Sequence, residues 1–283
     1  MNQELITMTE KWKSLERKTV KQREKAENFY ETKLMKLIEE EFIANNAGKV
    51  YEKVEYLIMS VGTSYEPLVL DIQLLQPRRI LFLYTERTEC ILEKIVKYCQ
   101  LDAMRYSKRE VNETDPLDIY REIKAAYLKW SRPDKMYIDF TGGTKSMSAA
   151  AAMAGAVINV QLIYIGTTNY LTDFRKPEPG SETLYYISNP VEIFGDLEIE
   201  KAFALFDKFN YAGARKKLEE LKESVPTPDI RQQLSFVYDL ALAYEHWDAL
   251  EFPAAYETMR SLTRELERDS RLNRDFLMMD FLP

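Results

Sequence analysis

The sequence predicts an α/β fold with a mainly parallel sheet, preceded by a helical arm and followed by an all-α extension. Short apolar runs alternate with helical patterns over residues 49–190. Glycine and hydroxyl residues collect directly after several of these runs, and residues 191–283 carry helical periodicity. The chain of 283 residues therefore divides into a helical arm (1–48), an α/β domain (49–190) and a helical domain (191–283).

The helical arm is predicted from apolar residues that recur at steps of three and four through residues 1–47, with charges between them. Asn45-Asn46-Ala47-Gly48 supplies a helix-ending signal. We therefore expect helix throughout residues 1–47.

The α/β domain is predicted from apolar runs that lack the alternation of a half-exposed strand. The predicted strands are residues 56–61, 79–84, 103–106, 135–140, 161–165 and 183–187. The predicted helices are residues 65–76, 89–98, 115–130 and 146–159. Continuously apolar strands alternating with helices indicate a parallel sheet covered on both faces. Ligands of such sheets bind at the carboxyl ends of the strands, where the glycines and hydroxyls collect here.

The C-terminal part contains an internal echo at an offset of 41 residues. The segment from Phe206 to Leu218 aligns with the segment from Trp247 to Met259, with aromatic, aspartate and small residues in matching places. This repeat predicts two similar helix–turn–helix units. We place the domain boundary near Asn189-Pro190. The sequence stops at Phe281-Leu282-Pro283 without a polar tail, which is the pattern expected of a piece of a longer protein.

Composition excludes several classes of function. The chain has 46 acidic and 39 basic residues, and the 19 acids against 12 bases of residues 192–283 argue against binding of a nucleic-acid duplex there. With His246 as the one histidine and only Cys90 and Cys99 as thiols, no zinc site, other metal site or Ser-His-Asp triad is expected. No apolar run is long enough for a membrane span, so we expect a cytoplasmic protein in a reducing compartment.

The most informative motif is Asp139-Phe140-Thr141-Gly142-Gly143-Thr144-Lys145-Ser146, which follows a predicted strand and opens a predicted helix. Two glycines allow a sharp turn with backbone N–H groups facing a ligand. The helix start adds its dipole, and Lys145 adds a full positive charge. This combination favours an anion site suited to phosphate over a plain capped turn.

A second motif, Gly62-Thr63-Ser64, follows the first predicted strand and so shares the same sheet edge. Taken alone, it is more typical of a helix cap. Neither motif fits the common nucleotide fingerprints, because a Walker A loop needs glycine directly before lysine and a dinucleotide site needs GxGxxG. An ATPase that uses this loop and an NAD enzyme are therefore disfavoured.

Together, the two motifs resemble those of the CARF family, the CRISPR-associated Rossmann-fold sensor domains. The VGTS-type turn at Val61–Ser64 and the DFTGGTKSM segment at Asp139–Met147 carry the resemblance, which covers roughly residues 50–190. It implies a Rossmann-like domain, acting as a homodimer, that binds a cyclic oligoadenylate such as the tetra- or hexa-adenylate made by type III CRISPR complexes. The helical segments on either side are similar to those of a CARF subfamily with helical extensions.

The resemblance also implies roles for individual residues. The phosphates and riboses would be held by Thr141, Gly142, Gly143, Thr144, Lys145 and Ser146. A base or ribose would contact Gly62, Thr63 and Ser64. From their place at the sheet edge alone, we expect four more residues to line the pocket: Tyr84, Thr85, Gly166 and Thr167.

The expected function is a cyclic oligoadenylate sensor of an antiviral response, without a cofactor, that relays a conformational signal to an effector absent from this chain or supplied separately. Many CARF proteins carry a HEPN ribonuclease with an R-x4–6-H motif, which this chain lacks because no arginine precedes His246 at that spacing. Two alternatives stay open. The first is a metal-independent ring nuclease that would use Lys145, Thr144 and Ser146. The second is a helical-repeat scaffold without nucleotide binding. Ring size is left open.

Overall fold

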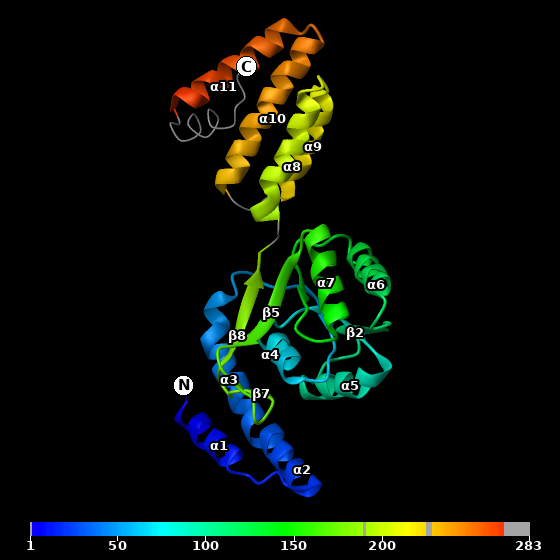
Figure 1. Cartoon of the computed structure of the whole chain (residues 1–283), viewed down its shortest axis with the longest axis vertical. Coiled ribbons are helices and arrows are strands. Elements are labelled where there is room, and N and C mark those ends of the chain that lie inside the picture. Colours follow the sequence, from blue (N-terminus) through cyan, green and yellow to red (C-terminus); the bar gives the residue numbers. More distant parts are fainter. Residues whose placement is uncertain (1, 189–190, 225–227, 269–283) are drawn as a thin grey trace. The chain divides into compact units, whose positions relative to one another are not determined.

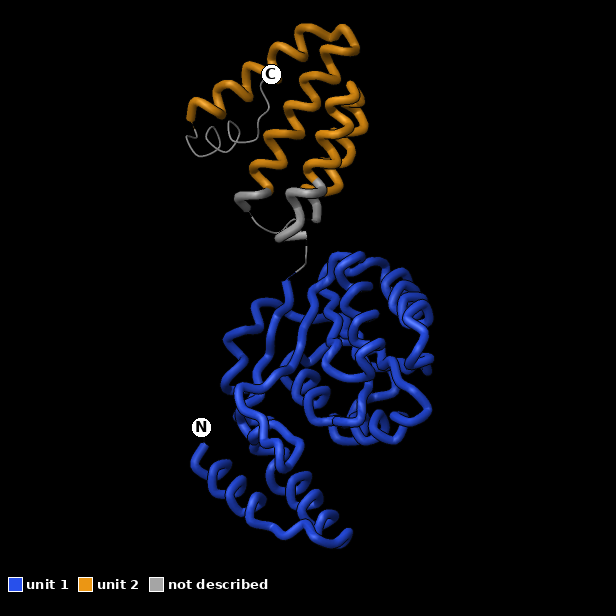
Figure 2. The backbone as a smooth tube through the Cα atoms, viewed as in Figure 1, with its two compact units in different colours: residues 1–188 blue, residues 189–283 orange. Residues whose placement is uncertain are grey.

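The structure is a computed structural model that describes residues 2–188, 191–224 and 228–268. The chain forms two compact units, residues 1–188 and residues 189–283 (Figure 2). The boundary predicted at Asn189-Pro190 and the chain end at Phe281-Leu282-Pro283 lie outside the described residues. Among the helices described, none combines the length and the apolar character that a membrane crossing requires.

The first unit begins with three α-helices, α1 (Gln3–Lys13), α2 (Val20–Phe29) and α3 (Met35–Asn46), with a π-helical turn (Tyr30–Leu34) joining the last two. The prediction of helix throughout residues 1–47 is therefore wrong at residues 14–19. The chain restarts at Thr19, whose side chain accepts a hydrogen bond from the backbone of Gln22 while the Gln22 side chain accepts one from the Thr19 backbone. This capping box starts a new helix inside a polar stretch.

These helices are built into the core of the first unit. Trp12, Tyr30 and Phe42 are fully buried in the same apolar cluster as strand residues of the sheet. Asn46 at the end of α3 donates to the Phe42 carbonyl and accepts the backbone N–H of Leu184. The helical arm is thus joined to the sheet both by apolar packing and by buried hydrogen bonds.

The sheet has six strands in the order β3-β2-β1-β4-β5-β8. Their bounds are β1 Tyr56–Ser60, β2 Arg79–Tyr84, β3 Tyr106–Glu110, β4 Met136–Asp139, β5 Gln161–Thr167 and β8 Glu182–Ile187. All neighbours pair in parallel except β5 and β8, which pair antiparallel. A small hairpin, β6 (Tyr170–Leu171) and β7 (Lys176–Pro177), lies between β5 and β8. The mainly parallel α/β fold predicted from the sequence is confirmed.

Helices cover both faces of the sheet, as Figure 1 shows. They are α4 (Glu66–Leu75), α5 (Glu89–Tyr98), α6 (Pro116–Lys129) and α7 (Lys145–Val157), with short 3-10 turns at Ala47–Lys49 and Glu86–Thr88. Leu57 and Met59 of β1 point into the core with α3, α4 and α5, and Ile58 points into the core with α6 and α7. Burial on both faces explains why the strands are continuously apolar.

The predicted strand at residues 103–106 is displaced, because β3 begins only at Tyr106 and runs through polar residues. Its residues Lys108, Arg109 and Glu110 are exposed. An edge strand with charged, exposed side chains carries little hydrophobic signal, so an apolar pattern could not place it.

Over residues 191–224 and 228–268, the second unit contains four α-helices, α8 (Val191–Phe206), α9 (Tyr211–Ser224), α10 (Pro228–Asp248) and α11 (Phe252–Arg268). The sequence echo falls on the turns between α8 and α9 and between α10 and α11. The two turns share a left-handed residue at matching places, Phe209 with φ 61° and Leu250 with φ 62°. Each half of the echo thus spans a turn between two helices.

Candidate ligand-binding site

The two motifs singled out in the sequence meet at the carboxyl edge of the sheet. Strands β1 and β4 are neighbours, and Met59 of β1 pairs with Asp139, the last residue of β4. The loops that follow these strands therefore leave the sheet side by side. This adjacency follows from the strand order, in which β1 and β4 flank the point where the chain reverses its direction of winding.

The contact between the two loops is a backbone contact that only glycine permits. A Cβ atom on Gly142 would lie 2.2 Å from the Ser60 carbonyl oxygen, and one on Gly62 would lie 2.6 Å from the Gly143 backbone nitrogen. Gly143 has φ +88°, the left-handed region that favours glycine. The Ser60 hydroxyl donates to the Gly142 carbonyl over 2.6 Å and joins the loops further.

Helix α7 starts directly after the second loop and directs its first turn toward it. Thr144 is the N-cap residue, and its hydroxyl accepts the Met147 backbone N–H over 3.3 Å. The backbone N–H groups of Lys145 and Ser146, in contrast, have no acceptor within the helix. The Lys145 side chain is exposed, and among the described residues no acidic side chain pairs with it. The start of α7 thus offers free donors and an unpaired cation to an anion.

The predicted hydroxyl ligands fall into two groups. The side chains of Thr63, Ser64 and Ser146 make no hydrogen bond to another described residue, and Thr63 and Ser64 are exposed. The Thr141 hydroxyl instead accepts the Ile165 backbone N–H over 2.8 Å, and the Thr144 hydroxyl also donates to the Glu113 carbonyl over 3.2 Å. The second pair already has structural partners within the chain.

The four residues expected from edge geometry lie at the ends of the flanking strands β2 and β5. They are largely buried, or their hydroxyls form hydrogen bonds within the protein. Tyr84 and Thr85, at the end of β2, are 8% and 7% exposed, and the Thr85 hydroxyl contacts the Thr88 hydroxyl at 3.2 Å. At the end of β5, Gly166 is buried, and the Thr167 hydroxyl bonds to the Asn169 carbonyl at 2.6 Å and to the Ser181 hydroxyl at 2.5 Å. These residues lie at the edge, with little free polar surface.

Sequence reasoning missed two exposed aromatic side chains beside Gly166. Tyr164 and Tyr185 are paired across β5 and β8, are 38% and 42% exposed, and have ring centroids 6.4 Å apart. Phe140, from the loop after β4, stacks on Tyr164 with a centroid distance of 5.9 Å. The available signal was a tyrosine within an otherwise aliphatic strand, two residues before a glycine.

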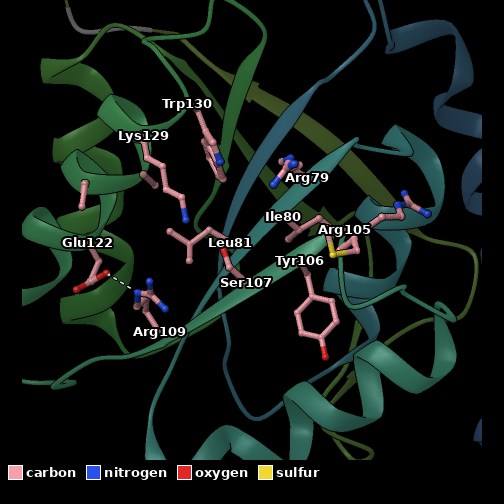
Figure 3. Close-up of a pocket in the computed structure, with 13 residues that line it drawn as sticks. Arg79, Ile80, Leu81, Arg105, Tyr106, Ser107, Arg109, Glu122, Lys129 and Trp130 are labelled. Carbon is pink, nitrogen blue, oxygen red and sulfur yellow. Dashed lines mark ion pairs between the residues drawn. The ribbon is translucent and has the colours of Figure 1, made fainter.

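A basic pocket lies at a different edge of the same sheet (Figure 3). It has a volume of about 100 Å³ and is formed where β2 and β3 begin, next to the end of α6. Figure 3 shows Arg79, Arg109 and Lys129 around Leu81 and Ser107, and Arg109 is paired with Glu122 at 3.3 Å. Because parallel strands start at the edge opposite to the one where they end, this pocket is separate from the two loops.

The histidine and the two cysteines do not belong to the two loops. His246 in the last turn of α10 contacts Glu251 at 2.6 Å, Cys90 and Cys99 are free, and burial raises the pKa of the Cys99 thiol to about 12. Within residues 2–188, 191–224 and 228–268, no group of three or more His, Cys, Asp or Glu side chains is arranged to hold a metal ion.

Comparison with known proteins finds two domain families in this chain. The Card1 CARF domain matches residues 68–178, and the Csm6 6H domain matches residues 194–276. The first match includes the Gly142-Gly143 loop, Lys145 and the exposed Tyr164. The second covers the helix–turn–helix units.

Two individual proteins are similar to this chain. The CRISPR system endoribonuclease Csm6 of Thermus thermophilus is 27% identical over 222 residues, which cover 76% of this chain and 46% of that protein. This chain therefore spans about half the length of the curated relative it matches. Among solved structures, Can2 from Sulfobacillus thermosulfidooxidans in complex with cyclic tetra-adenylate matches with a TM-score of 0.38 and 13% identity, over 69% of this chain and 68% of that one. Residues 68–178 are thus similar to the Card1 CARF domain, and residues 194–276 are similar to the Csm6 6H domain.

Proposed function

We propose that this chain is a cytoplasmic sensor of a type III CRISPR antiviral response that binds a cyclic oligoadenylate across the axis of a homodimer. The observation that carries the proposal is the backbone contact between the Gly62 and Gly142 loops beside the exposed, unpaired Lys145. A cyclic oligoadenylate presents several phosphates on one ring. Paired copies of a glycine turn, a helix start and a lysine are suited to grip such a ring.

The polar groups at the carboxyl edge of the sheet differ in whether they already have a hydrogen-bond partner among the described residues, and this difference suggests how the ring is held. The backbone of Gly142 and Gly143, the first N–H groups of α7 and the side chains of Lys145 and Ser146 would hold phosphate and ribose. Thr63 and Ser64 would contact ribose or base. The exposed ring of Tyr164 is suited to stacking against an adenine, since aromatic stacking accepts any base.

An apolar face on α6 and α7 supports the homodimer. Leu128, Met153 and Val157 are 48%, 60% and 85% exposed and lie along one groove between these two helices. Helix α7 connects the two places, since it begins at Lys145 beside the proposed ligand loop and its last turns line the groove. A second copy packed on this face would cover the apolar surface and bring a second ligand loop to the ring.

We propose that ring binding changes the conformation of the protein and that an effector responds to this change. Such a change requires that the ring bind one arrangement of the dimer better than another. The Thermus thermophilus relative is named an endoribonuclease, while this sequence carries no R-x4–6-H motif. We therefore propose that ring binding rearranges the CARF dimer and that the 6H-type segment relays this change to a ribonuclease outside the present sequence.

A ring nuclease is the second candidate. Cleavage would need the ribose 2′-OH to attack the adjacent phosphate, which forms a 2′,3′-cyclic phosphate and breaks the bond to the 5′-oxygen of the next nucleotide. The 5′-oxygen leaves as a hydroxyl and takes up the proton lost by the 2′-OH, while Lys145 and Ser146 would stabilise the developing charge. Both side chains are free of partners among the described residues, whereas the third predicted candidate, Thr144, already uses its hydroxyl as a helix cap. This observation favours Lys145 and Ser146 as the pair that would act.

Calorimetric titration with cyclic tri-, tetra- and hexa-adenylate in EDTA tests these proposals, with chromatography of the nucleotide afterwards. We expect one ring bound per two chains. An intact ring recovered afterwards supports the sensor alone, and a linear product supports the nuclease. Absence of binding to all three rings would refute the proposal and leave a scaffold role for the helical units.

The dimer surface has its own test. Val157→Asp places a charge on the exposed apolar face, and we expect it to convert a dimer into a monomer by light scattering and to weaken ring binding. Lys124→Asp, a charge change at the rim of the same groove, is the control that leaves the apolar residues in place. A wild-type protein that stays monomeric with ring bound would contradict the dimer proposal.

A further inference from the structure

Two fully buried carboxyl groups lie beneath the second loop. Asp71 of α4 and Asp139 at the end of β4 are both 0% exposed, and their side chains are within hydrogen-bonding reach of each other. Neither carboxyl oxygen of Asp71 receives a hydrogen bond from a described donor, and the same is true of Oδ2 of Asp139. A pair of buried acids facing each other requires a chemical explanation.

Two ionised carboxylates would repel each other strongly in so buried a place, so one of them must hold a proton. Asp139 accepts the Thr141 backbone N–H at 2.8 Å. Asp71 has no such donors. The charge therefore resides on Asp139 and the proton on Asp71, whose O–H donates to the Asp139 carboxylate.

The direction of the pKa shifts agrees with this assignment. Burial raises the pKa of Asp139 to about 6, with the hydrogen bond from Thr141 opposing the rise. Burial and the neighbouring Asp139 charge raise the pKa of Asp71 well above its ordinary value. Tyr186 of β8, whose buried hydroxyl lacks a described partner, is the other titratable group that faces Asp71.

The pair belongs to a chain of hydrogen bonds that crosses the proposed site. Asp71 lies on α4, the helix that follows the Gly62 loop, and Asp139 precedes the Gly142 loop. Thr141 bonds to Asp139 and, through its hydroxyl oxygen, accepts the Ile165 N–H of β5 at 2.8 Å. One proton on Asp71 thus helps to tie three neighbouring elements of the sheet edge together.

We propose that Asp71 is a positioning residue, whose protonated carboxyl donates to Asp139 and so holds Thr141 and the Gly142-Gly143 turn in one conformation for ligand binding. Asp71 does not touch the ligand in this arrangement. The role in ligand binding rests on the proposed function, whereas the role in fixing the loop does not. The two can therefore be tested separately.

Three proteins are compared: wild type, Asp71→Asn and Asp71→Leu. Asparagine keeps the shape and supplies an N–H donor to Asp139, while leucine fills the space and supplies none. In the absence of nucleotide, hydrogen exchange of the Thr141 amide, which donates to Asp139, should be protected in wild type and Asp71→Asn. Protection should fall at least about tenfold in Asp71→Leu, since Asp139 then stays buried with one partner fewer. Affinity for the cyclic oligoadenylate should follow the same order.

A pH series gives a readout that requires only the conservative variant. Folded wild type holds a proton on Asp71 that the unfolded chain releases above about pH 4, so its stability should fall as pH rises from 5 to 8. Asp71→Asn cannot lose this proton, and its melting temperature relative to wild type should therefore rise over the same range. Glu182, with a pKa of about 7, is present in both proteins and cancels in the difference. Asp139, whose pKa burial raises to about 6, interacts with residue 71, so its titration forms part of the measured difference.

The outcomes are distinguishable. Equal loop protection in all three proteins, or a melting-temperature difference that does not change with pH, would overturn the role of Asp71. If wild type binds none of the rings while the loop and pH effects are as expected, the positioning of the loop stands and the proposed ligand is wrong. If Asp71→Leu fails to fold, the pH series on wild type and Asp71→Asn still decides the question.

Discussion

The central strands β1 and β4 and the flanking strands β2 and β5 end at the same sheet edge, but their polar side chains serve different purposes. At the flanking ends, the hydroxyls of Thr85 and Thr167 bond to Thr88 and to Asn169 and Ser181. After the central strands, the side chains of Thr63, Ser64 and Ser146 make no hydrogen bond within the part of the chain that the structure describes, and Lys145 is exposed.

This difference teaches that position at the carboxyl edge is not enough to identify a ligand residue. A hydroxyl after a strand either closes the turn that it occupies or remains available to a ligand, and its hydrogen-bond partners decide which. We therefore place the ligand-binding surface at the centre of the edge, with the flanking ends as supports. The following predictions test this division.

The largest effect is expected from separating the two central loops. Gly142→Ala places a Cβ atom 2.2 Å from the Ser60 carbonyl oxygen, so the loops must move apart. We expect ring binding to be lost within the range of calorimetry, with the far-UV circular dichroism of an α/β protein retained. Gly48→Ala, where nothing lies within 4 Å of the new Cβ, is the matched control. Unchanged affinity in Gly142→Ala would remove the paired loops as the site.

A less disruptive substitution at the same contact tests the loops without the risk of misfolding. Ser60→Ala removes only the 2.6 Å hydrogen bond to the Gly142 carbonyl and leaves the glycine turn intact. We expect a smaller loss of affinity than in Gly142→Ala, because the backbone contact persists.

The next effect is expected from Lys145, the exposed cation at the start of α7. Hydrogen bonds to charged groups contribute about 1.5–3 kcal/mol, so Lys145→Ala should weaken ring binding about 10- to 150-fold per site. Lys129→Ala removes the same charge from the basic pocket at the opposite edge and should leave affinity unchanged. The reverse result, loss of binding in Lys129→Ala alone, would move the anion site to that pocket.

A smaller effect is expected from Tyr164, which lies between the central and the flanking ends. Stacking of a base on an aromatic ring contributes about 1–3 kcal/mol, so Tyr164→Ala should weaken binding about 5- to 150-fold. Tyr164→Phe keeps the ring and should bind like wild type. If alanine and phenylalanine have the same affinity as wild type, the exposed Tyr164 ring does not stack on a base.

The sequence was a good guide to the elements that are buried on both faces. The strands β1, β2, β4 and β5 carry apolar runs, and their turns contain glycine, so both the sheet and the adjacency of the two loops could be predicted. The edge strand β3 could not, because its side chains are polar and exposed. The break in the N-terminal helices was missed although Thr19 and Gln22 form a capping box, a local signal that was available.

At the candidate site, too, the sequence predicts some hydrogen bonds and not others. The Thr85–Thr88 contact joins residues three apart and follows a capping pattern that spacing can suggest. The Thr141–Ile165 bond and the Asp71–Asp139 pair join residues far apart in the chain, which only tertiary packing brings together. Residue type and spacing indicate an anion site here, but the three-dimensional structure was needed to separate its free groups from its bonded ones.

The smallest effect on binding, and the sharpest test of the division, is expected at the flanking ends. Thr85→Val and Thr167→Val remove hydroxyls that bond within the protein, so affinity for the ring should stay within about threefold of wild type. Each lost hydrogen bond contributes about 0.5–1.5 kcal/mol, so its loss lowers the melting temperature by about 1–6 °C in a unit of this size. Ser146→Ala is the opposite case, since we propose that its hydroxyl, which has no partner among the described residues, contributes to ligand binding rather than to stability. We expect weaker binding with an unchanged melting temperature. If the valine variants lose affinity as Ser146→Ala does, the flanking ends bind the ligand too, and the site extends across all four strands.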